Sequence, residues 1–199
     1  MTGTKQEPLD LWTQFHRAFE AEIRGTSDED LYAAWQKPSR RTKLYAGTIV
    51  PKIASHLGLS DISELFKVDW VMRTPCSTGE FVPVVFVESE NVAKTAGHEM
   101  RKLCAISCPL AVLITVIEWN PTVFPKKASR DRLMTEWERI IKAHYEIWPR
   151  QGTIGVIVGE WGPNNFLRFY SLAYSTQGEI CDQPSLLFEK PIGTIDTGG

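Results

Sequence analysis

Two glutamates, Glu88 and Glu90, end an otherwise apolar segment that begins at Phe81. Residues two apart in a β-strand point to the same face of a sheet, so both carboxylates are expected to point the same way. Carboxylates are seldom buried without a partner, and two like charges this close repel unless protons, cations or a metal intervene. The pair therefore predicts a polar site at the end of a buried strand.

A third acid is expected to lie beside this pair. Residues 66–72 and 81–90 are rich in valine and aromatic residues, and residues 74–80 between them have the composition of a turn. This pattern predicts an antiparallel hairpin. With the turn centred near Ser77 to Gly79, Asp69 falls opposite Val87 to Glu88, and side chains paired in this way are about 5 Å apart.

Three converging carboxylates indicate the type of ion that such a site would hold. Oxygen ligands suit magnesium or manganese better than zinc, because hard cations prefer carboxylate, carbonyl and water oxygens. A divalent ion of this kind polarises a phosphate and lowers the pKa of a bound water, as phosphodiester hydrolysis requires. The predicted metal ligands are Asp69, Glu88 and Glu90, with Mg²⁺ or Mn²⁺ as the cofactor.

The elements that would position these acids indicate an α/β fold. The strand over 81–90 carries apolar residues on both faces, which is typical of a strand in the middle of a sheet. A helix is expected over 93–107 and a second strand, apolar on both faces, over 110–119. This order predicts a right-handed parallel crossover. The fold class is therefore α/β, with a mixed central sheet, a β-hairpin and a βαβ crossover flanked by helices.

The length of 199 residues favours one domain, residues 1–199, organised in three parts. Residues 1–60 form a helical part, in which a helix over 40–57 is expected to be interrupted or kinked at Pro51. Residues 61–120 form the core. Residues 121–199 contain a long helix that Ser129 begins and Pro149 ends, and two strands over 153–158 and 166–174. The tail after Gln183 is expected to be irregular.

Part of this pattern resembles the PD-(D/E)XK nuclease superfamily, the restriction-endonuclease-like proteins. That superfamily places an Asp on one strand, an acidic-x-Lys triplet on the next, and then a crossover helix; the matching residues here are Val68-Asp69 and Glu88-Ser89-Glu90. The runs Phe86-Val-Glu-Ser-Glu-Asn91, His98-Glu-Met-Arg-Lys102 and Leu110-Ala-Val-Leu-Ile-Thr115 resemble a group of uncharacterised bacterial members. The resemblance covers residues 40–119.

The resemblance implies a Mg²⁺- or Mn²⁺-dependent endonuclease that hydrolyses DNA phosphodiester bonds, with DNA favoured over RNA. Asp69 and Glu88 would be metal ligands, and Glu90 a ligand or general base. Glu90 stands where the superfamily usually has lysine, and Lys102 on the following helix would then be the charge stabiliser. A homodimer would supply the two sites needed to cut both strands. The alternative is a catalytically degenerate nuclease fold that binds nucleic acid or protein, and the Glu at position 90 supports it.

Each of these residues also has an ordinary structural interpretation. Glu88 and Glu90 would be ordinary strand-end acids if Lys67, Arg73 or nearby backbone amides satisfied them, and Asp69 would be a solvent-facing residue on an outer strand. Pairing of the two glutamates with Lys67 or Arg73 would favour a scaffold without a site. Lys102 lies three residues after Glu99, a spacing that commonly gives a solvated ion pair on a helix.

Other charged residues compete for roles in the site. Lys94 is a rival for the role of Lys102, and either Glu22 or Glu64 would be the additional acid that superfamily members often contribute from a preceding helix. Two basic clusters, Arg40-Arg41-Lys43 and Lys126-Lys127-Arg130-Arg132, are candidates for phosphate contacts or for solvated helix starts.

The overall charge excludes a general attraction to polyanions. The 22 basic residues nearly balance the 24 acidic ones, so any nucleic-acid site must be local. Residues 1–10 lack the apolar segment of a secretory signal, and the longest apolar run, 110–117, is far short of the roughly 20 residues that span a bilayer. The sequence predicts a cytoplasmic protein that does not contact membranes.

Overall fold

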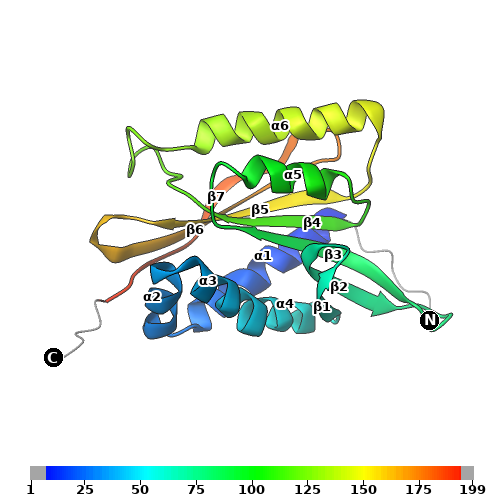
Figure 1. Cartoon of the computed structure of the whole chain (residues 1–199), viewed down its shortest axis with the longest axis horizontal. Helices are drawn as coiled ribbons and strands as arrows, with labels where there is room; N and C mark the ends of the chain where they lie inside the picture. The colour runs from blue at the N-terminus through cyan, green and yellow to red at the C-terminus, as the bar shows by residue number, and fades with distance from the viewer. Residues whose placement is uncertain (1–7, 194–199) are drawn as a thin grey trace.

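A computed structural model describes residues 8–193 as a seven-stranded sheet between two layers of helices (Figure 1). The strands lie in sequence order, β1 to β7. The three central strands are parallel to one another, and the two strands on each side are antiparallel to their neighbours. The strands are β1 (Ser60–Leu65), β2 (Val68–Pro75), β3 (Phe81–Glu90), β4 (Leu110–Val116), β5 (Thr153–Trp161), β6 (Phe166–Tyr174) and β7 (Ile180–Pro191).

The helices divide between the two faces of the sheet. In Figure 1, α5 and α6 lie above the sheet, and α1 to α4 lie below it. The helices are α1 (Pro8–Gly25), α2 (Asp28–Gln36), α3 (Pro38–Leu44), α4 (Val50–His56), α5 (Ala96–Cys104) and α6 (Arg130–Ile147), with a short 3₁₀ turn η2 (Pro163–Asn165) between β5 and β6. The predicted α/β class with a mixed central sheet is confirmed.

The hairpin and the crossover that position the acids both form as predicted. Strands β2 and β3 are antiparallel, and backbone hydrogen bonds between Cys76 and Glu80 and between Cys76 and Gly79 close the turn. Gly79 has a positive φ of 85°, a conformation that glycine adopts without steric cost. Strand β3 then connects through α5 to β4, which runs parallel to it.

Two outer strands were not expected from the sequence. Strand β1 pairs with β2, and its side chains are mostly exposed, so it carries little hydrophobic pattern. The expectation of an irregular tail after Gln183 is wrong through Pro191, because β7 pairs with β6 along most of its length. Residues 121–193 therefore contain three strands rather than two. Residues 194–199 lie outside the described part of the chain.

The segment predicted as a helix interrupted at Pro51 is helical throughout but changes its winding. A π-helical turn, η1 (Tyr45–Ile49), joins α3 to α4 immediately before Pro51. Proline has no N–H to donate and its ring clashes with the carbonyl four residues earlier. Single π turns accommodate such a position without ending the helix, so the prediction of an irregularity near Pro51 is confirmed.

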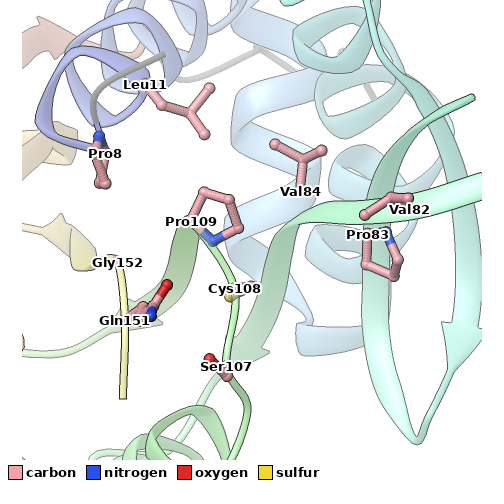
Figure 2. Close-up of a pocket in the computed structure, with 10 residues that line it drawn as sticks. All are labelled: Pro8, Leu11, Val82, Pro83, Val84, Ser107, Cys108, Pro109, Gln151 and Gly152. Atoms are coloured by element: carbon pink, nitrogen blue, oxygen red, sulfur yellow. The ribbon is translucent and has the colours of Figure 1, made fainter. Parts of the chain in front are cut away.

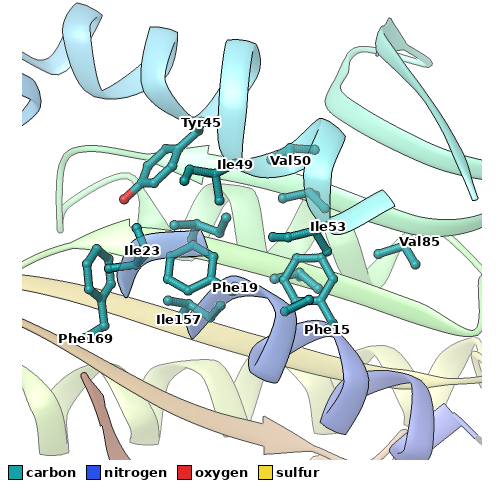
Figure 3. Packing of buried hydrophobic residues seen from close by; sticks show 14 of the residues in the cluster. Phe15, Phe19, Ile23, Tyr45, Ile49, Val50, Ile53, Val85, Ile157 and Phe169 are labelled. Carbon is teal, nitrogen blue, oxygen red and sulfur yellow. The ribbon is translucent and has the colours of Figure 1, made fainter. Parts of the chain in front are cut away.

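The sheet separates two hydrophobic cores. On one face, α1, η1 and α4 bury Phe15, Phe19, Tyr45 and Ile53 against the sheet, together with Val85 and Ile157 of the strands (Figure 3). On the other face, α5 and α6 bury a second cluster that includes Met100 and Trp137. The central strands are covered on both faces, as the apolar residues on both sides of β3 and β4 predict. Among residues 8–193, no helix is long and apolar enough to cross a membrane.

Candidate functional site

Asp69 and Glu88 lie opposite each other on neighbouring strands, at the end of the β2–β3 ladder. The ladder pairs Trp70 with Val87 and Met72 with Val85, and the same register extended by one residue places Asp69 opposite Glu88. Both side chains lie on the face that α5 and α6 cover, because Val71 and Phe86, two residues away on each strand, belong to the core of that face. Asp69 Oδ2 accepts a hydrogen bond of 2.8 Å from the backbone N–H of Ser89.

Lys102 of α5 joins these acids from the helical layer. Its Nζ lies 2.6 Å from Glu88 Oε1 and 2.7 Å from Glu99 Oε2, and it donates a hydrogen bond of 3.2 Å to the carbonyl of Lys67. The Glu88 side chain is only 3% exposed, whereas that of Lys102 is 30% exposed. No donor meets hydrogen-bond geometry at Glu88 Oε1. Its contact with Lys102 is therefore a short ion pair in which the N–H groups are not aligned with the carboxylate oxygen.

Helix α5 approaches α6 closely at Gly97. A Cβ atom there would lie 2.3 Å from Glu136 Oε1, the far end of a flexible side chain of α6. A larger residue at position 97 would therefore push the Glu136 carboxylate aside.

Burial dominates the protonation of the two strand acids. The pKa of Glu88 is raised to about 7: desolvation and the neighbouring Asp69 charge raise it, and Lys102 opposes both effects. Burial also raises the pKa of Asp69, although the Ser89 N–H and Lys102 favour its ionised form. The pKa of Lys102 is raised too, since its bonds to Glu88 and Glu99 outweigh its own desolvation. Lys102 thus stays charged while Glu88 titrates near neutral pH.

The remaining predicted residues lie nearby but are not joined to this cluster. Glu90 Oε1 accepts a hydrogen bond of 2.8 Å from Val92 N–H in the loop that follows β3. Within residues 8–193, neither Lys67 nor Arg73 forms an ion pair with Glu88 or Glu90, and Arg73 instead lies 4.3 Å from the centroid of the Phe81 ring. The condition for a scaffold without a site is therefore not met in the described residues. Lys94 is exposed in the same loop.

The oxygen atoms around Lys102 are of the type that hard cations prefer. The ammonium group lies among two carboxylates and one carbonyl, and a carboxylate–carbonyl donor set suits Mg²⁺ or Mn²⁺ in its chemistry. In the arrangement described for residues 8–193, however, no three acidic, histidine or cysteine side chains come close enough to hold a metal ion. The oxygens are of the type that a divalent cation takes, and in this arrangement Lys102 supplies the positive charge beside Glu88.

The chain matches no protein-family model and no curated protein sequence. The resemblance to the nuclease superfamily therefore rests on the residues themselves and on the elements that carry them.

The basic clusters lie on opposite faces of the sheet. Arg41 of α3 is buried and donates a hydrogen bond of 2.7 Å to Asn91 Oδ1, directly after β3. The exposed Arg40 and Lys43 line a hollow with Asp30 of α2 and Lys52 of α4, in the helical layer away from the acids. In the second cluster, Lys126 and Lys127 lie in the connection after β4, and Arg130 and Arg132 lie in the first turn of α6. Figure 1 shows α3 and this connection on the same side of the molecule, on opposite faces of the sheet.

The additional acid of the site is one that sequence reasoning considered only as a partner of Lys102. Glu99 projects from α5 and shares the Lys102 ammonium with Glu88. Neither earlier candidate joins this cluster. Glu22 of α1 pairs with Lys52 and His56 of α4, and Glu64 is exposed on β1. The three-residue spacing of Glu99 and Lys102 is the signal that would have found Glu99.

A second buried acid, Glu160, was not singled out although it has the same signature as Glu88. It ends the apolar strand β5 and is 0% exposed. One of its oxygens accepts hydrogen bonds from the backbone N–H groups of Trp119 (2.8 Å) and Asn120 (2.6 Å). Arg168 lies 3.7 Å from its other oxygen. These contacts hold the connection after β4 in place, so Glu160 is a structural acid.

A hollow of about 580 Å³ lies at the opposite end of the parallel strands (Figure 2). Leu11 of α1, Val82 and Val84 of β3, Pro109 and Gly152 help to line it, and the last two precede β4 and β5. Its lining includes none of Asp69, Glu88, Glu90 or Lys102. The hollow is therefore separate from the acid cluster.

Proposed function

We propose that the chain is a nuclease of the PD-(D/E)XK type, which hydrolyses phosphodiester bonds of DNA at the acid cluster. One observation supports this proposal above the others. Asp69 and Glu88 face each other on adjacent strands, and the crossover helix brings a lysine ammonium to 2.6 Å from Glu88. This is the combination of two strand acids and one cation that the nuclease pattern requires, with the cation supplied by α5 in place of position 90.

The acids and the lysine of the cluster would have separate roles in catalysis. Asp69 and Glu88 would hold Mg²⁺ or Mn²⁺, with Glu90 as a further ligand or as the base that takes a proton from water. A bound divalent ion would polarise the phosphate and lower the pKa of its water ligand. Lys102 would stabilise the negative charge that develops on the phosphate oxygens.

Cleavage assays on the full chain test this proposal. We expect Mg²⁺- or Mn²⁺-dependent nicking of a plasmid or shortening of a single-stranded oligonucleotide, lost on addition of EDTA. Asp69→Asn and Glu88→Gln should each lower the rate by about 10²-fold or more, as removal of a catalytic group typically does. Asp61→Asn is the matched control, because Asp61 is exposed on β1 and pairs with Met72, away from the cluster. Equal rates in all four proteins would refute the nuclease.

A second candidate is a binding module that keeps the fold without catalysis. The observation in its favour is that Lys102 already neutralises Glu88, while no three acids converge among residues 8–193. This candidate predicts nucleic-acid binding without cleavage and no heat of Mn²⁺ binding in calorimetry. Saturable Mn²⁺ binding that Asp69→Asn abolishes would favour the nuclease instead.

A further inference from the structure

The turn between β1 and β2 has an unusual conformation for its residues. Leu65 pairs with Val68, so the turn consists of Phe66 and Lys67 alone. Both have positive φ angles, 56° and 61°, and Glu64 just before them has a φ of 55°. Two-residue turns with positive φ at both positions strongly favour Asn-Gly, because glycine has no Cβ and the short polar side chain of asparagine tolerates this conformation better than larger side chains do. The chain keeps a phenylalanine where asparagine would be more stable.

Burial does not account for this phenylalanine. The Phe66 side chain is 68% exposed. Its ring lies 6.4 Å from the ring of Phe86, centroid to centroid, and Phe86 precedes Glu88 by two residues on the same face of β3. Phe66 therefore presents an aromatic ring to solvent on the sheet face that carries the acids.

The turn is also bonded directly to the acid cluster. The carbonyl of Lys67 accepts the hydrogen bond from Lys102 Nζ, and Asp69 follows two residues later. The exposed ring and the acids thus belong to one small region, with the backbone of the turn fixed by the same lysine that pairs with Glu88.

We propose that Phe66 stacks on an unpaired base of the nucleic acid that the acid cluster cleaves. This inference rests on the proposed nuclease function and specifies its substrate as single-stranded or locally opened nucleic acid. An exposed aromatic ring stacks on any base, because every base has a π-face, whereas the bases of an intact duplex are already stacked on each other. The strained turn holds the ring at the edge of the site, where a base beside the scissile phosphate would lie.

Binding measurements with Phe66 variants test this role. Fluorescence anisotropy would compare a labelled single-stranded oligonucleotide with its duplex, in an Asp69→Asn background that prevents cleavage. Phe66→Asn and Phe66→Leu should weaken single-strand binding by about tenfold, the usual effect of losing one stacked aromatic ring, and leave duplex binding unchanged. Phe66→Trp should retain the affinity. Trp148→Ala is the matched control, because Trp148 is 73% exposed after α6, near the opposite end of the parallel strands.

Thermal unfolding separates this role from a structural one. Phe66→Asn should raise the melting temperature by relieving the positive φ, so its loss of binding would not arise from unfolding. Equal single-strand affinities of the parent, Phe66→Asn and Phe66→Leu proteins would overturn the role of Phe66 and leave the nuclease proposal standing. Absence of any nucleic-acid binding by the parent would overturn both.

Discussion

The ammonium nitrogen of Lys102 lies 2.6 Å from a carboxylate oxygen of Glu88 that is almost fully removed from solvent. The Lys102 ammonium group and a divalent metal ion would both neutralise the Glu88 carboxylate, so they would compete for it.

Replacing Lys102 by methionine should strengthen metal binding while it abolishes cleavage. Removal of the ammonium group leaves Glu88 without its cation, and a hard divalent ion would then meet less competition. We expect Mn²⁺ to bind about tenfold more tightly, which corresponds to about 1.4 kcal/mol. Calorimetry at pH 8.5, above the pKa of about 7 that Glu88 has beside Lys102, measures this directly. Lys94→Met removes the same charge from an exposed lysine, so an equal gain in that variant would contradict the competition.

The stability of the protein should fall as the pH rises from about 4.5 to about 7. The pKa of Glu88 is raised from 4.5 to about 7 by burial, so in this window the folded protein keeps a proton that the unfolded chain has released. The free energy of unfolding then decreases with pH, by at most about 1.4 kcal/mol per unit. Urea unfolding at several pH values tests the sign. In Glu88→Gln this slope should be smaller, and an unchanged slope would assign the effect to other groups.

Cleavage should follow the opposite trend with pH. Glu88 must be ionised to hold a cation, so the rate at fixed Mn²⁺ should increase as the pH rises through about 7. A rate profile from pH 5.5 to 8.5 measures this inflection. A cleavage rate that does not change across this range would show that the ionisation of Glu88 does not control the rate.

Glu160 should contribute to stability and not to chemistry. Glu160→Ala removes the acceptor of two backbone N–H groups, Trp119 and Asn120, and leaving buried donors unpaired costs about 1–3 kcal/mol each. Glu160→Gln retains one carbonyl oxygen and should cost less. Denaturant unfolding of both variants gives the comparison. An equal loss in the two variants would mean that the negative charge beside Arg168, which both variants remove, matters more than the two hydrogen bonds.

Elements with a strong local pattern could be predicted from the sequence. Strand β3 and strand β4 are apolar on both faces, and the turn at Cys76 to Glu80 has its own glycine, so the hairpin, the crossover and the opposed Asp69 and Glu88 followed by counting residues. Strand β1 could not be found in this way. Its residues are mostly exposed, and it exists as a strand because β2 offers it hydrogen bonds. Strand β7 depends on β6 in the same manner.

The contacts within the site were only partly predictable for a related reason. The pair of Lys102 with Glu99 follows from their three-residue spacing, but its distance to Glu88 depends on how α5 returns over β3, which no local spacing specifies. The strain at Phe66 and Lys67 was equally hidden, because the sequence Leu-Phe-Lys-Val reads as a continuous strand rather than a turn.

The contact between Gly97 and Glu136 pairs a rigid position with a yielding one. A methyl group at position 97 would overlap the Glu136 carboxylate, which is the far end of a flexible side chain and can swing aside on α6. A small substitution at position 97 would therefore be absorbed at the surface of the helical layer, while Lys102 kept its place beside Glu88.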